Sequence, residues 1–411
     1  MNILLLNQAF YPDVVSTGQH AADLAAALVA AGHQVTVIAS RRAYDDPSRR
    51  FPSREVWRGI RIIRIGMLGL GKSSRWRRYA DFASFSANCF LRMLLLPRAD
   101  LVIALTSPPL ISALGALLVR LKGGKLVSWV MDLNPDEAIA AGLMRADSRT
   151  GRLLSSLLQF SLRRSDRLIV LDRYMAQRLI DKGVPEQNLA VIPPWSHDVV
   201  FRDPAGREAF RRDHGLDGKF VVMYSGNHSP CHSLDTVLAA AQRLRDQAGI
   251  MFCFVGGGSE FHKVREFAAD RNLSNIRSIP YQPLDRLSAS LSAADLHVVV
   301  MGDPFVGIVH PCKVYNIRRL GIPFLYIGPI PSHVTELSPA ARFPQGDVEG
   351  VTQFLSRCAA GFVPHAAAFN NEFSQQVLLS RMLDAIESLD LASLSASARK
   401  AASAGASKIS L

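Results

Sequence analysis

A histidine, a cysteine and a lysine lie close together in the segment GIVHPCKVYNIRRLGIPFLYIG, residues 307–328. His310 and Cys312 are zinc-ligating residue types, Cys312 could act as a nucleophile, and Lys313 is a cation that binds phosphate groups. The run PFLYIG is typical of a buried strand, and KVYNIRRL is typical of a short helix. The three side chains are therefore expected in a loop beside a sheet, where metal binding, covalent catalysis and anion binding are all open.

The composition indicates two domains and an anionic partner. The chain has 411 residues, with 47 Lys and Arg against 35 Asp and Glu, and its formal net charge is +12. This length exceeds that of most single cores, and the positive charge favours phosphorylated molecules, anionic lipid or nucleic acid. Five scattered cysteines without a secreted disulfide spacing favour a reducing cytosol. No run of about 18 apolar residues is present, so any membrane contact is expected to be peripheral.

Short apolar runs alternate with helical stretches along the chain. The predicted strands are residues 2–6, VTVIAS, RIIRIG, DLVIAL, KLVSWV and DRLIVL in the first half, and FVVMYSG, IMFCFVGGG, NIRSIP, DLHVVVM and PFLYIG in the second. Runs of this kind are typical of parallel sheets buried on both faces. We predict an α/β fold of two Rossmann-like, doubly wound domains, with ligands beyond the carboxyl ends of the strands.

The predicted boundaries follow from the proline-rich stretch VIPPWSHDVVF and from the composition of the C-terminus. Residues 1–195 form the first domain and residues 196–365 the second. Residues 366–390 are expected to contain a helix that packs back toward the first domain. The Ala- and Ser-rich residues 391–411 are predicted to be disordered.

Several segments together resemble glycosyltransferase family 4. They are FYPDVVSTGQHAADLAAALVAAGHQVTVIAS, DLNPDEAIAAG, VVMYSGNHSPCHSLDTVLAAAQRL, FVGGGSEFHKVREFAADRNLSNI and residues 307–328, in family order. The resemblance is greatest to the bacterial subgroup that builds surface polysaccharides, of the colanic acid type. It implies a GT-B fold, in which two Rossmann-like domains face a cleft, with the acceptor on the first and the sugar nucleotide mainly on the second. It also implies retention of the anomeric configuration, with no metal and no cofactor.

The turn GNHSPCHS, residues 226–233, departs from the family pattern, which places an Arg and a Lys there to clamp the donor diphosphate. Charge that develops on the leaving diphosphate must still be stabilised. We expect Gly226, Asn227, His228, His232 and the backbone N–H groups of the following helix to contribute. The alternative is that both histidines only cap and solvate the helix start.

Residues 307–328 also lack two carboxylates of the family pattern. The ribose-binding Glu of the family falls at Asn316, and an earlier Glu falls near Ile308. Asn316 can still exchange hydrogen bonds with a ribose hydroxyl. Lys313 is the expected replacement cation and a catalytic residue, with His310 as a further donor contact. The alternative for Lys313 is a solvated surface lysine.

Other loops are assigned through the resemblance. Gly257 borders the donor site, and Tyr281 and Gln282 match the place that holds the nucleobase, although a plain turn explains them equally well. Thr17 and Gly18 match the turn that approaches the diphosphate from the first domain, where only a small residue lets the backbone come close.

Asp132 is the expected catalytic residue on the acceptor side. It follows the strand KLVSWVM, and a carboxylate at the end of a strand can bind or deprotonate an acceptor hydroxyl. The alternative is that the polar residues after it, Asn134 and Asp136, only cap a helix.

Residues 71–98, GKSSRWRRYADFASFSANCFLRMLLLPR, combine Lys72 and three arginines with Trp76, Tyr79 and an apolar run. Such a stretch can lie in an anionic bilayer interface, and an ordinary amphipathic helix is the alternative. An anionic membrane surface is the expected partner. Nucleic acid is not, because no recognition fold is present.

The leading hypothesis is a hexosyl- or N-acetylhexosaminyltransferase that is cytoplasmic and peripheral on the inner face of the bacterial plasma membrane. It would move a sugar from a nucleoside diphosphate sugar to a hydroxyl of a lipid-linked or growing glycan. One alternative is a sugar-nucleotide epimerase on the same fold, and another is a non-catalytic protein that binds a glycan or a transferase. A third alternative is a variant of the protein that binds zinc through His228, Cys231, His232, His310 and Cys312.

Overall fold

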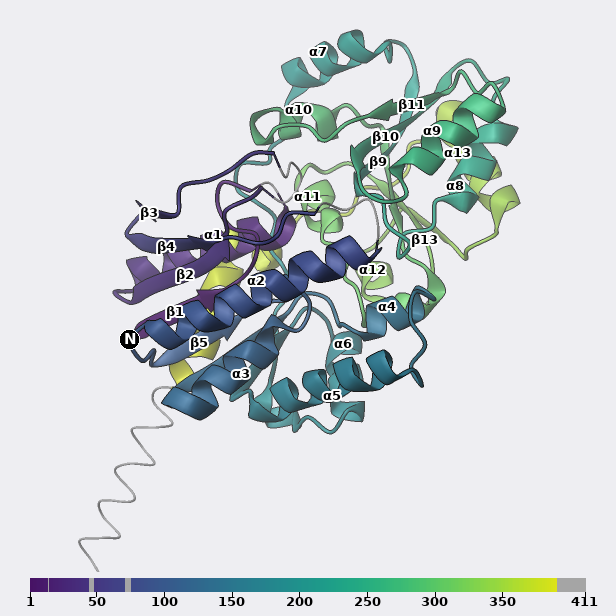
Figure 1. The fold of residues 1–411 in the computed structure, drawn as a ribbon. Coiled ribbons are helices and arrows are strands. Elements are labelled where there is room, and N and C mark those ends of the chain that lie inside the picture. The colour runs from purple at the N-terminus through teal and green to yellow at the C-terminus, as the bar shows by residue number, and fades with distance from the viewer. Residues whose placement is uncertain (14, 44–47, 71–74, 390–411) are drawn as a thin grey trace, which may run out of the picture.

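The computed structural model describes residues 1–13, 15–43, 48–70 and 75–389. It contains two α/β domains, each built on a parallel sheet, stacked end to end (Figure 1). The predicted fold class is thereby confirmed. Residues 391–411 and Lys72, for which predictions were made, lie outside the described residues.

The N-terminal sheet has the strand order β3-β4-β2-β1-β5-β6-β7-β8, and only the β3–β4 pair is antiparallel. Its central strands are continuous apolar runs because helices cover both faces of the sheet. The strands are β1 (Asn2–Leu6), β2 (Gln34–Ser40), β3 (Arg54–Trp57), β4 (Ile60–Ile65), β5 (Leu101–Ala104), β6 (Lys125–Val130), β7 (Arg167–Val170) and β8 (Leu189–Val191).

The C-terminal sheet is parallel throughout, with the order β11-β10-β9-β12-β13-β14. Its chain order reverses at β9, so that β10 and β12 flank that strand, and the loops after β9 and β12 open at the same carboxyl edge. The strands are β9 (Phe220–Asn227), β10 (Ile250–Gly257), β11 (Ile276–Ile279), β12 (Leu296–Val300), β13 (Phe324–Ile327) and β14 (Ala341–Phe343).

The helices of the N-terminal domain are α1 (Ser16–Ala30), α2 (Arg75–Leu95), α3 (Ile111–Lys122), α4 (Asp136–Ala140), α5 (Arg149–Arg164) and α6 (Arg173–Asp181). Those of the C-terminal domain are α7 (Pro204–His214), α8 (Asp235–Arg243), α9 (Phe261–Asp270), α10 (Leu287–Ser292), α11 (Lys313–Arg319), α12 (His333–Glu336) and α13 (Val348–Ala359). None of the described helices is long and apolar enough to cross a bilayer.

Sequence analysis missed α7 and the short edge strands β3, β8 and β14. The α7 sequence, PAGREAFRRDH, is mostly polar and lacks the apolar period on which helix prediction depends. The residues at its ends are nevertheless typical of helix termini. Asp203 caps the first turn, Pro204 is the first helical residue, and Gly215 ends the helix with a positive φ of 67°.

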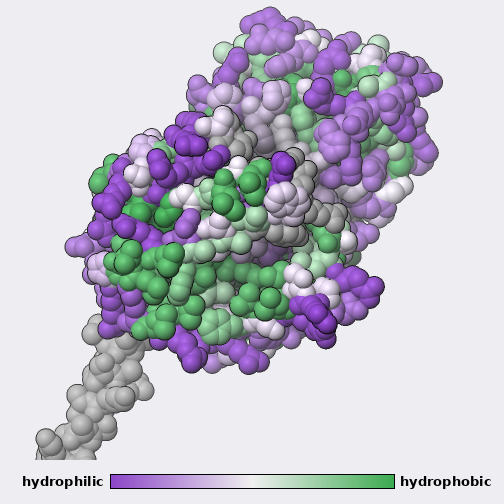
Figure 2. All heavy atoms as spheres, in the orientation of Figure 1, coloured by the Kyte–Doolittle hydropathy of each residue, from purple (hydrophilic) through white to green (hydrophobic). Residues whose placement is uncertain are grey.

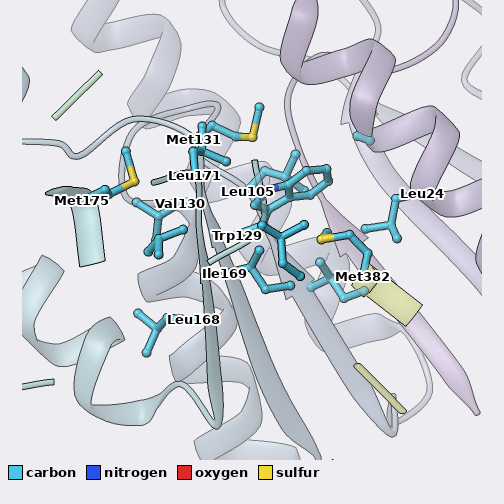
Figure 3. Close-up of a cluster of buried hydrophobic side chains, with 14 of the residues drawn as sticks. Leu24, Leu105, Trp129, Val130, Met131, Leu168, Ile169, Leu171, Met175 and Met382 are labelled. Carbon is cyan, nitrogen blue, oxygen red and sulfur yellow. The ribbon is translucent and has the colours of Figure 1, made fainter. Parts of the chain in front are cut away.

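A last helix, over residues 375–389, returns from the C-terminal domain to the N-terminal one. Its buried residues Leu378, Met382, Ile386 and Leu389 belong to the same core cluster as Leu24 of α1. Figure 3 shows Met382 beside Leu24, Trp129 and Ile169, on the sheet face that α1 also covers. The helix thus closes one face of the N-terminal sheet, while α2 and α3 cover the other (Figure 1).

Candidate active site between the two domains

The carboxyl edges of the two sheets face each other, with α12 next to α4 and α6 (Figure 1). The two edges touch directly. The backbone N–H of Leu133, after β6, donates to the carbonyl of Ile308 at 2.9 Å. Arg178 of α6 donates from Nε to the carbonyl of Val306 at 2.6 Å. Gly307 allows this approach, since its φ is +70° and an added Cβ would lie 2.6 Å from the carbonyl oxygen of Tyr174.

Lys313 opens α11 and points its amine at the end of β9. Its Nζ lies 3.4 Å from the ring centroid of Tyr224, and an added Cβ on Gly226 would lie 3.1 Å from it. The nitrogen is buried and has no hydrogen-bond partner among the described residues. Burial lowers the pKa of Lys313 to about 7. A buried ammonium without an anion is costly, and this cost is the physical cause of the lowered pKa.

The turn after β9 brings two neutral imidazoles to the same edge. His228 pairs through Nδ1 with the carbonyl of Gly226 at 3.0 Å, and its buried Nε2 has no hydrogen-bond partner in the part of the chain that the structure describes. His232 pairs through Nδ1 with the carbonyl of Val300 at 2.9 Å. Burial, followed by the charge of Lys313, lowers the pKa of His228 to about 4 and that of His232 to about 3. Both rings are uncharged at neutral pH, so the cationic character of this edge rests on Lys313.

His310 makes its contacts within the protein. Its Nδ1 lies 2.7 Å from Oδ2 of Asp172, the N-cap of α6, and its Nε2 lies 2.8 Å from the hydroxyl of Tyr315. His333 stacks on it at 3.7 Å between ring centroids. Both nitrogens of His310 are therefore engaged, and the residue joins the two domains instead of presenting a group to the donor.

Asn316 is also engaged at the domain boundary. Its Oδ1 accepts from the backbone N–H of His197, in the segment that links the two domains, at 3.1 Å. His197 lies beside Asp23 of α1, with 3.5 Å between Nδ1 and Oδ2. The residue at the family's ribose-binding position thus has its acceptor oxygen committed to the linker.

The start of α1 approaches the Lys313 loop from the N-terminal domain. Gly18 is buried, and a Cβ there would lie 3.3 Å from the carbonyl carbon of Ala9, while Thr17 is partly exposed beside it. Cys312 lies within hydrogen-bonding and electrostatic range of Ser16 and Asp132 across the domain boundary. Burial is the main cause that raises the pKa of the Cys312 thiol to about 12, so it is not a ready nucleophile.

Asp132 lies at the end of β6 with a second carboxylate, Glu137, nearby. Burial, with a further contribution from Glu137, raises the pKa of Asp132 to about 8. Glu137 accepts from Asn134 Nδ2 at 3.0 Å and from the thiol of Cys231 at 3.4 Å, across the domain boundary. Asp136 instead pairs with Lys182 at 2.7 Å. Sequence analysis named Asp136 in this segment, whereas Glu137 is the residue that faces the other domain.

The remaining predicted donor residues lie along the ends of β9 to β11. Asn227 is exposed, and its carbonyl accepts from Tyr224 at 2.7 Å. An added Cβ on Gly257 would lie 2.9 Å from the ring of Tyr281, so the two residues are in contact. Tyr281 is 46% exposed, and Gln282 bonds to the carbonyl of Pro280. They lie beside the Lys313 edge without being locked into the core.

The five residues of the zinc alternative do not converge. His228, Cys231, His232, His310 and Cys312 each bond to a different group. Among the described residues, Asp172, His310 and His333 form the one cluster of metal-ligand type. Its 2.7 Å His310–Asp172 contact is a hydrogen bond, shorter than the separation of about 3.3 Å between tetrahedral zinc ligands, and the two imidazole rings are stacked. This arrangement fits a buried hydrogen-bonded pair.

Comparison with known proteins agrees with this architecture. Residues 17–195 match the model of the glycosyl transferase 4-like domain, and residues 206–309 match that of glycosyl transferases group 1. The chain belongs to the GT-B glycosyltransferases. It is 28% identical over 336 residues to the putative colanic acid biosynthesis glycosyl transferase WcaI of Escherichia coli K12, covering 78% of this chain and 82% of that protein. The family resemblance drawn from the sequence is confirmed.

Solved structures of this glycosyltransferase fold cover nearly the whole chain. Sucrose-phosphate synthase from Thermosynechococcus elongatus matches with a TM-score of 0.74 at 15% identity, over 95% of this chain and 100% of that one. HepE of Anabaena, in complex with UDP and glucose, matches with a TM-score of 0.69 at 14% identity, over 94% of this chain and 100% of the other. At such identities the likeness establishes the fold and leaves the ligands to this chain's own residues.

Four residues of this glycosyltransferase site were not found from sequence: Glu137, Asp172, Tyr224 and His333. Tyr224 is part of a buried strand run and carried no signal. Glu137 follows Asp136 directly, and spacing alone did not show which carboxylate faces the C-terminal domain. Asp172 and His333 are 161 positions apart and meet only through the docking of the two domains.

Proposed function

We propose that this glycosyltransferase transfers a hexosyl or N-acetylhexosaminyl group from a nucleoside diphosphate sugar to a hydroxyl of a lipid-linked or growing glycan. The transfer would retain the anomeric configuration and use no metal. The observation that carries the proposal is the buried, unpaired amine of Lys313, at the edge of the C-terminal sheet that faces Asp132. The names of the relatives support it, since one is named for colanic acid biosynthesis and another was solved with UDP and glucose.

The donor side would work by charge. With its pKa lowered to about 7, Lys313 holds a proton only partly at neutral pH, and a bound diphosphate would favour the ammonium form. As the bond from the anomeric carbon to the diphosphate breaks, the departing oxygens gain negative charge, and a positioned cation stabilises that change most. Lys313 would thus supply the charge that other diphosphate sites draw from a metal or from several cations.

The acceptor side would work by hydrogen bonding. With a pKa of about 8, Asp132 is mostly protonated at neutral pH, so it would hold and orient the acceptor hydroxyl. A bond forms between the acceptor oxygen and the anomeric carbon, and the hydroxyl proton passes to the departing diphosphate. We place the reaction at the cytoplasmic face of the plasma membrane, where a lipid-linked acceptor and a soluble sugar nucleotide meet.

The experiment is a transfer assay on the purified protein with a panel of nucleoside diphosphate sugars, beginning with UDP-sugars, and lipid-linked acceptors. Melting temperatures with each donor identify the one that binds, because a ligand of the native state raises the midpoint. NMR of the product should give the donor's anomeric configuration, and EDTA should leave the rate unchanged. Inversion, or loss of activity that added metal restores, would contradict the proposal. An altered sugar nucleotide formed without acceptor would identify an epimerase.

Two variants test the role of Lys313. Lys313→Met keeps the length of the side chain and removes the charge, so donor affinity and transfer should fall while the fold remains. Its melting temperature should equal or exceed that of the wild type, since a buried unpaired ammonium is removed. Lys263→Met changes a lysine of α9 whose side chain is 60% exposed, and it should leave transfer unchanged. Equal activity of Lys313→Met and wild type would remove Lys313 from the site.

A further inference from the structure

Helix α2 is apolar on both of its sides. Its inner side buries Phe85, Cys89 and Met93 against the N-terminal sheet. Its outer side carries Leu91, at 60% exposure, and Leu95, at 77%. A surface helix normally turns a polar face to water, so this outward apolar stripe has no explanation in the fold of the N-terminal domain.

The neighbouring helices extend the same surface. Lys122 at the end of α3 donates to the carbonyls of Leu94 and Leu96 at 2.6 Å, which holds the ends of α2 and α3 together and places Leu121, 58% exposed, beside the α2 stripe. Helix α5 packs along α3 through a 3.1 Å Ser112–Ser161 hydrogen bond. We call the exposed leucines of these helices the leucine face: Leu91, Leu94, Leu95, Leu121, Leu153 and Leu157. Figure 2 shows hydrophobic side chains gathered in a broad band over α2 and α3.

The same three helices concentrate positive charge. The sequences of α2, α3 and α5 contain ten basic residues and one acid, Asp81, which is buried. The excess of nine compares with +12 for the whole chain. Arg98 at the end of α2, Arg120 on α3, and Arg149 and Arg152 on α5 are exposed and have no carboxylate partner among the described residues. The three helices and their ends therefore carry exposed cations as well as exposed leucines.

We propose that the leucine face docks on an anionic lipid bilayer, with its leucines at the boundary between headgroups and acyl chains and its arginines on lipid phosphates. This combination of exposed apolar side chains and unpaired cations is what an interfacial helix surface needs. A second copy of the chain is disfavoured as the occupant, because two such faces would bring their arginines together without an acid to neutralise them. The proposal extends the proposed function by assigning the surface that meets the membrane.

The docked orientation would serve the acceptor side of the site. Leu110 at the start of α3 and Leu158 and Leu162 of α5 line a small recess together with Asp132. Helices that rest on the bilayer thus also form the wall next to the acceptor carboxyl. A glycan carried on a lipid would reach Asp132 from the membrane side, while the Lys313 edge, in the other domain, would stay open to soluble sugar nucleotides.

The experiment is co-sedimentation of the full chain with vesicles, without donor or acceptor. The wild type should bind vesicles of equal parts phosphatidylglycerol and phosphatidylcholine and should bind pure phosphatidylcholine much less. Leu91→Asp with Leu95→Asp should weaken binding by at least about tenfold. Arg120→Glu with Arg152→Glu should weaken it by roughly fivefold for each charge, with a smaller effect at high salt.

Matched controls lie on the C-terminal domain. Val363→Asp changes a residue that is 85% exposed, and Arg265→Glu reverses an exposed charge on α9; both should bind vesicles like the wild type. Circular dichroism checks folding, and if the leucine variant does not fold, the arginine variant decides, since both of its side chains are on the surface. Because the assay omits sugars, its result is independent of whether transfer is found.

Two outcomes would overturn the proposal. The first is a wild type that does not bind anionic vesicles, or leucine variants that bind them unchanged. The second is a wild-type dimer, seen by sedimentation velocity, that the leucine variants convert to monomers, which would make this face an interface between copies of the chain.

Discussion

The two edges that face each other across the domain boundary carry opposite chemistry. The edge of the N-terminal sheet holds the carboxyl groups of Asp132, Glu137 and Asp172. The edge of the C-terminal sheet holds the amine of Lys313 among imidazoles that are uncharged at neutral pH. The same architecture, a parallel sheet ending in loops, thus presents carboxyl groups on one side and the amine of Lys313 on the other. Such a division suits an enzyme that holds a hydroxyl on one domain and a diphosphate on the other.

Burial shifts one group on each edge, Asp132 and Lys313, toward its neutral form. It raises the pKa of Asp132 to about 8 and lowers that of Lys313 to about 7, because a charged group loses solvation in either case. Neither group has an ion-pair partner within the described part of the chain. The protonation of both groups should therefore depend on what binds beside them. Substitutions at the two edges should affect different measurements, namely donor kinetics at Lys313 and the pH profile of kcat at Asp132.

Charge reversal at Lys313 should produce the largest effect. Lys313→Glu replaces a buried cation at the carboxyl edge of the C-terminal sheet by an anion, so kcat/KM for transfer should fall by about a thousandfold. Steady-state kinetics with the donor found by the binding screen would measure the loss. Arg265→Glu, an exposed reversal on the same domain, should retain full activity. A fall of less than about tenfold in Lys313→Glu would show that the donor edge does not depend on this cation.

Asp172 is where the two edges are joined, and its removal should cost the most stability. Asp172→Ala leaves His310 and His333 buried without their carboxylate and removes the cap of α6, so unfolding should become easier by about 3 kcal/mol in chemical denaturation. Asp198→Ala breaks an exposed pair with Arg319 and should cost less than about 1 kcal/mol. Equal costs for the two variants would mean that the buried pair does not hold the domains.

The pH dependence of the free energy of unfolding should also reveal the contact between Asp172 and His310. Contacts with His310 keep the pKa of Asp172 at about 2, below its ordinary value of 3.8. A carboxylate with a depressed pKa contributes stability above its unfolded pKa and loses it as the pH falls through the folded pKa. The wild type should therefore lose stability between about pH 4 and pH 2, and Asp172→Ala should lose less over that range.

The protonation state of Asp132, at the carboxyl edge of the N-terminal sheet, should determine the pH profile of kcat. If protonated Asp132 orients the acceptor, kcat should fall as the pH rises through about 8. Glu137→Gln removes a neighbouring negative charge, so the pKa of Asp132 should drop and the fall should begin about half a pH unit lower. Asp136→Asn alters the carboxylate that pairs with Lys182 and should leave the profile in place. A fall in kcat that begins at higher pH in Glu137→Gln than in the wild type would contradict this assignment.

Tyr281 should give the smallest effect. It is 46% exposed at the rim of the donor edge, so Tyr281→Ala should raise the KM for the donor by about threefold to tenfold through lost aromatic contact, with kcat unchanged. Tyr11→Ala, at a similar exposure of 38% on the N-terminal domain, is the matched control. An unchanged donor KM in Tyr281→Ala would remove this residue from the donor site.

The sequence by itself determined the two α/β domains and the loops that carry the site. Continuous β-branched runs specify buried parallel strands, and the segments at their carboxyl ends must meet at one edge of each sheet. The position of Asp132 at such an end followed from this rule, whereas Lys313 and the turn at residues 226–233 were singled out through the resemblance to the family. These features depend on local pattern, which a single sequence contains.

Only the tertiary structure decided how the side chains are paired. His310 lies 138 positions from Asp172, and its choice of that carboxylate depends on how the two domains dock. The amine of Lys313 lies over Tyr224 because β9, which is distant in the sequence, lies next to the start of α11 within the folded C-terminal domain. The leucine face likewise forms only when α2, α3 and α5 are laid side by side, since each helix alone carries only a few of its leucines. Pairing, burial and the resulting pKa shifts arise from the approach of distant segments, which local sequence does not specify.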